Sequence, residues 1–252
     1  MPITELLWIL LLGLTSGLLI GCIGIGGVLL VPSLLFLAQI PIQIGIPAAM
    51  MAYILAGIVG TSVFAHNKSI RWGMAAWLCL GAAPTAFAGA WAVSVVDPRL
   101  LEALLGLLTL LSGINSLRPR MAAKAVERTL SNGTLLTVGA GTGFLSAVSG
   151  SGGPLVLVPI LLTLRLPVLT AVGLSQAIQL PIAVAATVGN FLYGQIDLTL
   201  GGVIMAALTI GSWIGARLAH VVPRPILQRI VSVVLIAVGL FIFANIAWRL
   251  HE

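Results

Sequence analysis

Apolar residues fill long stretches of this chain, and polar residues gather in the short gaps between them. The apolar runs are about 20 residues long, the length that an α-helix needs to cross the hydrocarbon core of a bilayer. The short alternating segments of membrane barrel strands are not visible. The pattern therefore predicts an all-α polytopic membrane protein with roughly 8–10 membrane segments.

Glycines interrupt the first stretch, which runs from Ile3 to Ile40. One continuous helix would reach about 57 Å, about twice the hydrocarbon thickness, yet the stretch is short for two full spans and a turn. We therefore expect a long helix, a break near residues 24–27 and a short helix over residues 28–38. Further segments are expected over residues 44–65, 72–96 and 98–117. From Leu130 the pattern recurs, with breaks near residues 150–153, Asp197 and Pro223.

The two halves of the chain resemble each other at an offset of 126 residues. Chance predicts about two coinciding glycines, whereas seven coincide, which marks an internal repeat. The pairs are Gly13 with Gly139, Gly17 with Gly143, Gly24 with Gly150, Gly26 with Gly152, Gly27 with Gly153, Gly89 with Gly215, and Gly113 with Gly239. We expect a first membrane repeat over residues 1–121, a basic cytoplasmic linker over residues 122–129 and a second repeat over residues 130–252.

Basic residues favour inverted repeats. If each broken stretch enters the membrane and returns, ten basic residues share a face with the central loop "RPRMAAKAVER", and only Arg99 and Arg249 lie opposite. If the stretch crosses once, the division is nearly even. The positive-inside rule prefers the first arrangement and places the central loop in the cytoplasm. A cell (inner) membrane location follows as an expectation.

Composition agrees with this class of protein. Hydrophobic residues make up 60% of the 252 residues and charged residues 7%, with a mean hydropathy of +1.18. Soluble domains carry about 25% charged residues, so this chain cannot cover a water-facing surface. The net charge of +6 is assigned to cytoplasmic loops, and no nucleic-acid partner is expected. The opening "MPITELLWILLLGLTSGLLIG" lacks a basic leader and is expected to be the first membrane segment.

The duplicated glycine clusters are candidate binding sites. A broken membrane helix is tolerated only where it is buried or lines a cavity. The short helix that follows presents free N–H groups and a partial positive charge, which suits an anionic substrate. Candidate substrate-binding residues are Gly24, Gly26, Gly27, Ser149, Gly150, Ser151, Gly152 and Gly153. The other paired glycines, Gly13, Gly17, Gly89, Gly113 and their partners, are expected to serve close helix packing.

Other polar residues have two open interpretations. Thr61, Gln176, Gln179, Thr187 and Asn190 could line a path or form helix-to-helix hydrogen bonds. Arg165 and Arg217 could attract an anion or extend to the interface. All six carboxylates fall at segment ends or loops, so none is expected deep in the membrane. Such a core suits an anion better than a cation, and no catalytic residue, metal or cofactor is predicted.

"GIGGVLLVPSLL" and "GSGGPLVLVPILL", with "HNKSIRW" and "YGQIDL", resemble the TauE/SafE sulfite exporter family over essentially the whole chain. The resemblance implies a secondary transporter of sulfite, sulfonates, sulfoacetate or similar organic anions. In the first copy Ile23 and Ile25 stand where the second has Ser149 and Ser151, so the half-sites cannot be equivalent.

Several alternatives stay open from the residues alone. One is a carrier of another class, a metal cation or a carboxylate, although the membrane core offers mainly Cys22 and Cys79 as metal ligands. Another is an intramembrane serine hydrolase that uses Ser149 with His220. A channel and a non-transporting assembly factor are further readings. Lipid and a small anion are the expected partners, and a homodimer is left open.

Overall fold

The computed structural model describes residues 3–23, 27–117, 130–218 and 224–249, and these residues form ten helices and no strand. The first half holds α1 (Ile3–Ile23), α2 (Gly27–Phe36), α3 (Ile42–His66), α4 (Trp72–Val95) and α5 (Pro98–Leu117). The second half holds α6 (Asn132–Ser149), α7 (Pro154–Thr163), α8 (Val168–Tyr193), α9 (Leu198–Leu218) and α10 (Arg224–Arg249). Both halves thus show one order: a long helix, a ten-residue helix and three long helices.

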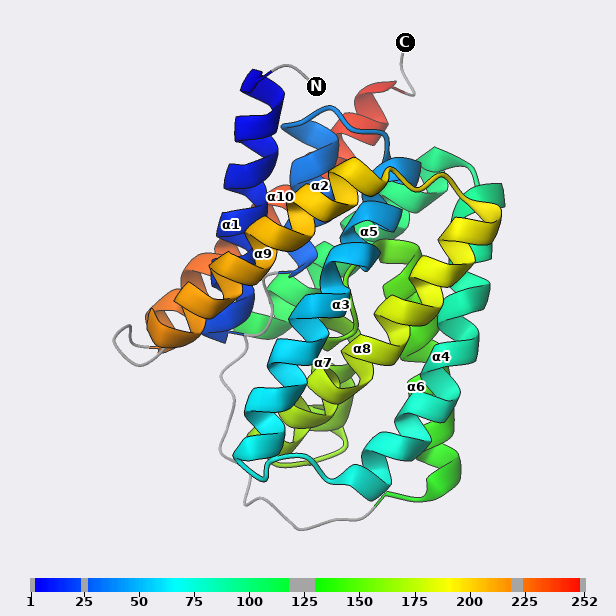
Figure 1. Ribbon diagram of the computed structural model, residues 1–252, viewed down its shortest axis with the longest axis vertical. Helices are drawn as coiled ribbons and strands as arrows, with labels where there is room; N and C mark the ends of the chain where they lie inside the picture. The colour runs from blue at the N-terminus through cyan, green and yellow to red at the C-terminus, as the bar shows by residue number, and fades with distance from the viewer. Residues whose placement is uncertain (1–2, 24–26, 118–129, 219–223, 250–252) are drawn as a thin grey trace.

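The glycine breaks turn the chain back toward the side from which it came. The α1 helix begins at the upper end in Figure 1, and α2 leads back to that end, where α3 starts. The α6 and α7 helices do the same from the lower end. The stretches therefore enter and return, and the two halves start at opposite ends of the molecule. This is the arrangement that an inverted repeat would produce.

The two halves do not pack as separate bodies. The most extensive helix contacts all join one half to the other: α4 with α6 and α8, α1 with α9, α5 with α10, and α3 with α8 and α9. In the order of helices, α1 corresponds to α6 and α9 to α4. The α1–α9 pair therefore has its counterpart in the α6–α4 pair. The short helices α2 and α7 mainly contact their neighbours in sequence.

Small residues make these contacts close. A Cβ atom added to Gly13 would lie 2.8 Å from Ala207 Cβ, and one on Gly239 would lie 2.8 Å from Leu110 Cβ. Similar clashes arise at Gly17, Gly89, Gly113, Gly139, Gly143 and Gly215. The expectation that these glycines serve helix packing is confirmed, because glycine lets two helix backbones approach closely.

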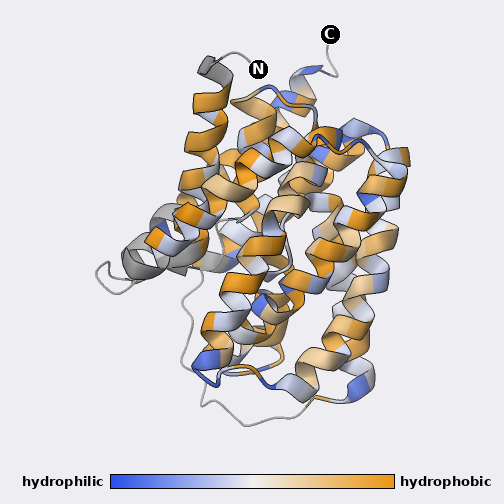
Figure 2. Cartoon of the chain, viewed as in Figure 1, coloured by the Kyte–Doolittle hydropathy of each residue, from blue (hydrophilic) through white to orange (hydrophobic). Residues whose placement is uncertain are grey.

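The outer surface of the bundle is apolar between two polar ends. Five helices of the described chain hold windows long and apolar enough to cross a membrane, and they belong to α3, α4, α8, α9 and α10. Large apolar side chains such as Trp8, Leu80 and Phe191 are more than half exposed on this surface. Figure 2 shows hydrophilic residues concentrated in the turns at the two ends. This is the surface of a multi-pass membrane protein.

The predicted boundaries are right to within a few residues. The first short helix covers Gly27–Phe36 instead of residues 28–38, and the third segment covers Ile42–His66 instead of residues 44–65. The break near Asp197 separates α8 from α9. The linker over residues 122–129 and the break at Pro223 lie outside the described residues.

Candidate functional site

Three glycines build the turn between α6 and α7. Gly150 ends α6 in the left-handed conformation with φ 66°, and its N–H donates to the Ser146 carbonyl oxygen. Gly152 and Gly153 also have positive φ angles, 76° and 112°, which residues other than glycine rarely adopt. Pro154 follows as the first residue of α7, a position where no N–H is needed. These residues make an abrupt break that is buried in the protein.

The two glycine breaks meet around one tyrosine of α3. The hydroxyl of Tyr53 donates to the Gly27 carbonyl oxygen at 2.6 Å, and its ring lies against Gly152, where an added Cβ would come within 2.9 Å of the ring. An added Cβ on Gly27 would lie 3.3 Å from the Ser151 carbonyl oxygen. Tyr53 itself is fully buried. The starts of α2 and α7, far apart in the sequence, are therefore neighbours at the centre of the protein.

A small cavity lies at this meeting point. It has a volume of about 10 Å³ and is lined by Ile20, Gly27, Val28, Tyr53, Ser151, Pro154, Leu155 and Gln179. A volume of this order holds about one water molecule. In this closed form the cavity is too small for a larger ligand, which requires the Tyr53 ring or a short helix to move.

The electrostatics of the cavity come from backbone groups. None of the described residues that line it carries a charge. The first turns of α2 and α7 both border the cavity, and the start of a helix carries free N–H groups and roughly half a positive charge. At α7 few of these N–H groups are free, because Pro154 has none and those of Val156 and Leu157 donate to the Gly153 carbonyl oxygen.

Two serines add hydroxyl groups on the side of the second half. Ser149 and Ser151 are 1% and 4% exposed. The single proton of the Ser149 hydroxyl has two acceptors within reach, the Leu145 carbonyl oxygen at 2.7 Å and Ser151 Oγ at 2.9 Å, and is donated to one of them at a time. The proton of Ser151 is not used in these bonds, and Ser151 lines the cavity. Of the two, only Ser151 lines the cavity, and Ser149 lies behind it within hydrogen-bond distance of its hydroxyl.

The polar residues of α8 follow one face of the helix. Gln179 reaches the cavity, and its amide oxygen is buried without a hydrogen-bond partner among the described residues. Thr187 Oγ1 and both polar atoms of Asn190 also lack such a partner. Thr187 and Asn190 follow Gln179 by 8 and 11 residues, which places them on the same helix face, closer to the end of α8. Buried polar groups without partners call for an explanation, and a path for polar molecules would supply one.

Thr61 of α3 and Gln176 of α8 take part in a helix-to-helix contact, the second interpretation considered for them. The Thr61 hydroxyl of α3 donates to the Gln176 carbonyl oxygen at 3.0 Å, which is a helix-to-helix hydrogen bond. The Gln176 side chain lies against Gly60 of α3 instead of entering the cavity. The structure therefore brings Gln179 to the junction and leaves Thr61 and Gln176 in the α3–α8 contact.

Some predicted site residues are elsewhere or undescribed. Arg165 is exposed in the turn between α7 and α8, at the end of α7 that points away from the cavity. Gly24 and Gly26 lie outside the described residues. Arg217 belongs to the last turns of α9, and its side chain lies outside the described part of the structure.

Tyr53 was missed as a site residue, although the sequence holds a signal for it. The offset of 126 residues that pairs the glycines also pairs Tyr53 with Gln179. Each half thus presents one polar side chain to the junction from its third helix. A search of the repeat for paired polar positions, instead of paired glycines alone, would have found it.

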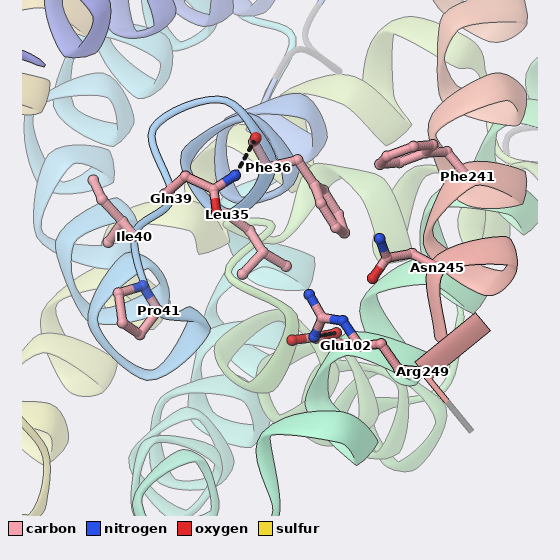
Figure 3. Close-up of a pocket in the computed structure, with 9 residues that line it drawn as sticks. All are labelled: Leu35, Phe36, Gln39, Ile40, Pro41, Glu102, Phe241, Asn245 and Arg249. Carbon is pink, nitrogen blue, oxygen red and sulfur yellow. Dashed lines mark hydrogen bonds and ion pairs between the residues drawn. The ribbon is translucent and has the colours of Figure 1, made fainter. Parts of the chain in front are cut away.

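A larger pocket lies at the other end of α2. It has a volume of about 350 Å³ and is lined by residues of α2, α5 and α10 and of the turn after α2 (Figure 3). Figure 3 shows Arg249 of α10 beside Glu102 of α5, and the two charged groups are 3.7 Å apart. Glu102 is only 6% exposed. The sequence correctly placed this carboxylate near a segment end, but its burial was not expected.

Comparison with known proteins finds one family over most of the chain. The family described as Sulfite exporter TauE/SafE matches residues 9–242. A relative from Bacillus subtilis (strain 168), named "Probable membrane transporter protein YdhB", is 28% identical over 232 residues, which cover 87% of this chain and 93% of the relative. No solved structure matches the chain.

Two further relatives carry the same kind of name. "Probable membrane transporter protein YunE" of Bacillus subtilis (strain 168) is 23% identical, over 92% of this chain and 94% of its own length. "Probable membrane transporter protein MJ0441" of Methanocaldococcus jannaschii is 24% identical, over 92% of this chain and 93% of its own. These matches favour transport over the intramembrane hydrolase, whose proposed base, His220, lies outside the described residues. The chain is a membrane transporter that belongs to the TauE/SafE sulfite exporter family.

Proposed function

We propose that this transporter carries small sulfur-containing anions, such as sulfite, sulfonates, sulfoacetate or similar organic anions. The observation that carries the proposal is the meeting of two short-helix starts, α2 and α7, at one cavity without charged side chains. Helix starts bind oxyanions well, because they bring a partial positive charge together with free backbone N–H groups. The family supports the sulfur chemistry, since its description names sulfite export.

The closed cavity supports an alternating-access carrier. Its α2 wall belongs to the first half and its α7 wall to the second, and the halves enter the membrane from opposite ends. Because the long helices of the two halves are interleaved, movement of the short helices α2 and α7 would open the cavity to one end at a time, as alternating access requires. Thr187 and Asn190, whose polar atoms have no partner among the described residues, would line the way toward the end of α8.

Binding by the purified protein tests the proposal. Thermal unfolding is followed with sulfite, sulfoacetate, thiosulfate and toluene-sulfonate, with chloride and acetate as control anions. A ligand at about a hundred times its Kd stabilises the folded state by about 2.7 kcal/mol. We expect a selective increase in Tm with at least one sulfur anion. An increase with acetate alone would contradict the sulfur assignment.

Two variants link the binding to the glycine junction. Gly152→Leu places a side chain against the Tyr53 ring at a backbone φ of 76° and should abolish the ligand-induced shift. Ser151→Ala adds no bulk and should weaken binding by about tenfold, because it removes one hydrogen-bond donor. Gly202→Leu is the control, since an added Cβ at Gly202 meets no atom within 4 Å. Wild-type affinity in a folded Ser151→Ala protein would argue against this site.

A further inference from the structure

Gln179 presents an unused hydrogen-bond acceptor to the cavity. Its side chain is 2% exposed, it lines the cavity, and its amide oxygen has no hydrogen-bond partner in the described chain. The amide carries this acceptor oxygen and an NH₂ group with two N–H donors. The oxygen is the group for which the described residues supply no partner.

The other free groups around the cavity are donors. The start of α2 and the Leu155 N–H of α7 supply backbone donors, and Ser151 supplies a hydroxyl proton. The Tyr53 proton is already donated to the Gly27 carbonyl oxygen, so Tyr53 does not satisfy Gln179. A fully deprotonated oxyanion accepts hydrogen bonds from these donors but has no proton to give to the acceptor of Gln179.

We propose that the site takes its anion in a protonated form, as a monoanionic oxyanion that still carries one O–H, with hydrogensulfite as the simplest sulfur example. The inference rests on the proposed function and narrows its substrate class. The deprotonated oxygens of the ligand accept from the helix starts and Ser151, and its O–H donates to Gln179. A neutral amide in the wall keeps the proton on the ligand, whereas a carboxylate there would compete for it.

This arrangement gives the carrier a simple proton stoichiometry. No carboxylate lines the cavity among the described residues, so the proton that accompanies the anion is held on the substrate. Each transported monoanion then carries one proton more than the dianion would. The site binds the dianion less tightly, because that form has no proton to donate to the Gln179 amide oxygen and leaves this acceptor unpartnered.

Titration calorimetry on the purified full-length protein tests the inference. The probes are sulfite, below and above its second ionisation, and methanesulfonate, a monoanion that has no proton to donate. The wild type should bind hydrogensulfite about tenfold or more tightly than methanesulfonate, because a buried acceptor left unpartnered weakens binding by this order. Sulfite affinity should fall as the pH rises through its second ionisation.

Matched variants isolate Gln179. Gln179→Leu should lower the affinity for hydrogensulfite about tenfold and leave that for methanesulfonate within about twofold. Gln176→Leu is the control, since Gln176 lies one turn away on α8 and does not line the cavity. Gln179→Met provides a second test if the leucine variant does not fold.

The outcomes separate this inference from the proposed function. If the wild type binds neither anion at any pH, the sulfur-anion function itself fails. If hydrogensulfite and methanesulfonate bind equally, or if Gln179→Leu weakens both alike, a water molecule or the helix ends satisfy the site. The protonated-ligand inference is then wrong, while the anion site stands.

Discussion

Tyr53 contacts both glycine breaks through different parts of one side chain. Its hydroxyl is bonded to Gly27 of α2, and its ring covers Gly152 before α7. The hydroxyl bond therefore joins α3 to α2 within the first half, and the ring carries the contact with the second half beside the cavity. Loss of this bond should loosen the closed conformation without changing how the ring packs.

Tyr53→Phe tests this role. Removal of the hydroxyl leaves the Gly27 carbonyl oxygen without this donor, so the free energy of unfolding should fall by about 1 kcal/mol. Tyr193→Phe is the matched control, because Tyr193 is 51% exposed at the end of α8. Denaturant unfolding in detergent measures both variants, and equal stabilities would show that the bond to Gly27 contributes nothing.

At the level of residues, the duplicated glycine clusters pointed to a junction between the halves. Gly27, Ser151 and Gln179 line one cavity and Gly152 lies against the Tyr53 ring, while their role in substrate binding stays a prediction. Glu102 shows the limit. It lies four residues into α5, and only the distant α2 and α10 helices make it buried.

Among the helices, the pairs α1–α9 and α4–α6 are held by close backbone contact. Gly139 and Gly143 of α6 face Leu78 and Ala82 of α4 with no room for a side chain. The local breaks that define α2 and α7 could be predicted, since they depend on glycine and proline chemistry within a few residues. The pairing of α1 with α9 could not be predicted in this way, because it depends on shape complementarity between helices roughly 200 residues apart in the sequence.

Two glycines of α6 give a matched pair for testing this contact. Gly143→Ala should lower stability by about 1–3 kcal/mol, since the new methyl group would collide with α4. Gly141→Ala should leave stability unchanged or raise it slightly, because nothing lies within 4 Å of an added Cβ and alanine favours a helix. Thermal unfolding of both variants decides the question, and similar losses would contradict the packing role.

For the whole molecule, the described charges divide between the two ends. The turns α3–α4 and α7–α8 share one end and carry Lys68, Arg71 and Arg165. The turns α4–α5 and α8–α9 share the other end and carry Asp97 and Asp197, and Arg99 at the start of α5 and Arg249 at the end of α10 lie at this end as well. By the positive-inside rule, the first end is expected to face the cytoplasm.

Labelling of single cysteines tests this orientation. In a chain with Cys22 and Cys79 replaced by alanine, Asn67→Cys and Gln195→Cys place one exposed thiol at each end. A reagent that does not cross membranes should label residue 195 in intact cells and residue 67 only after the membrane is opened. The reverse labelling would overturn the orientation and leave the fold unchanged.

The dominance of contacts between the halves has a consequence for synthesis of the protein. During translation, α1 and α4 enter the bilayer well before their principal partners, α9 and α6 respectively, have been made. The first five helices must therefore stay in lipid with their glycine-rich faces uncovered until the second half arrives. For this molecule, insertion and folding are separate events in time, and a ribosome that stalls after α5 leaves behind helices without most of their final neighbours.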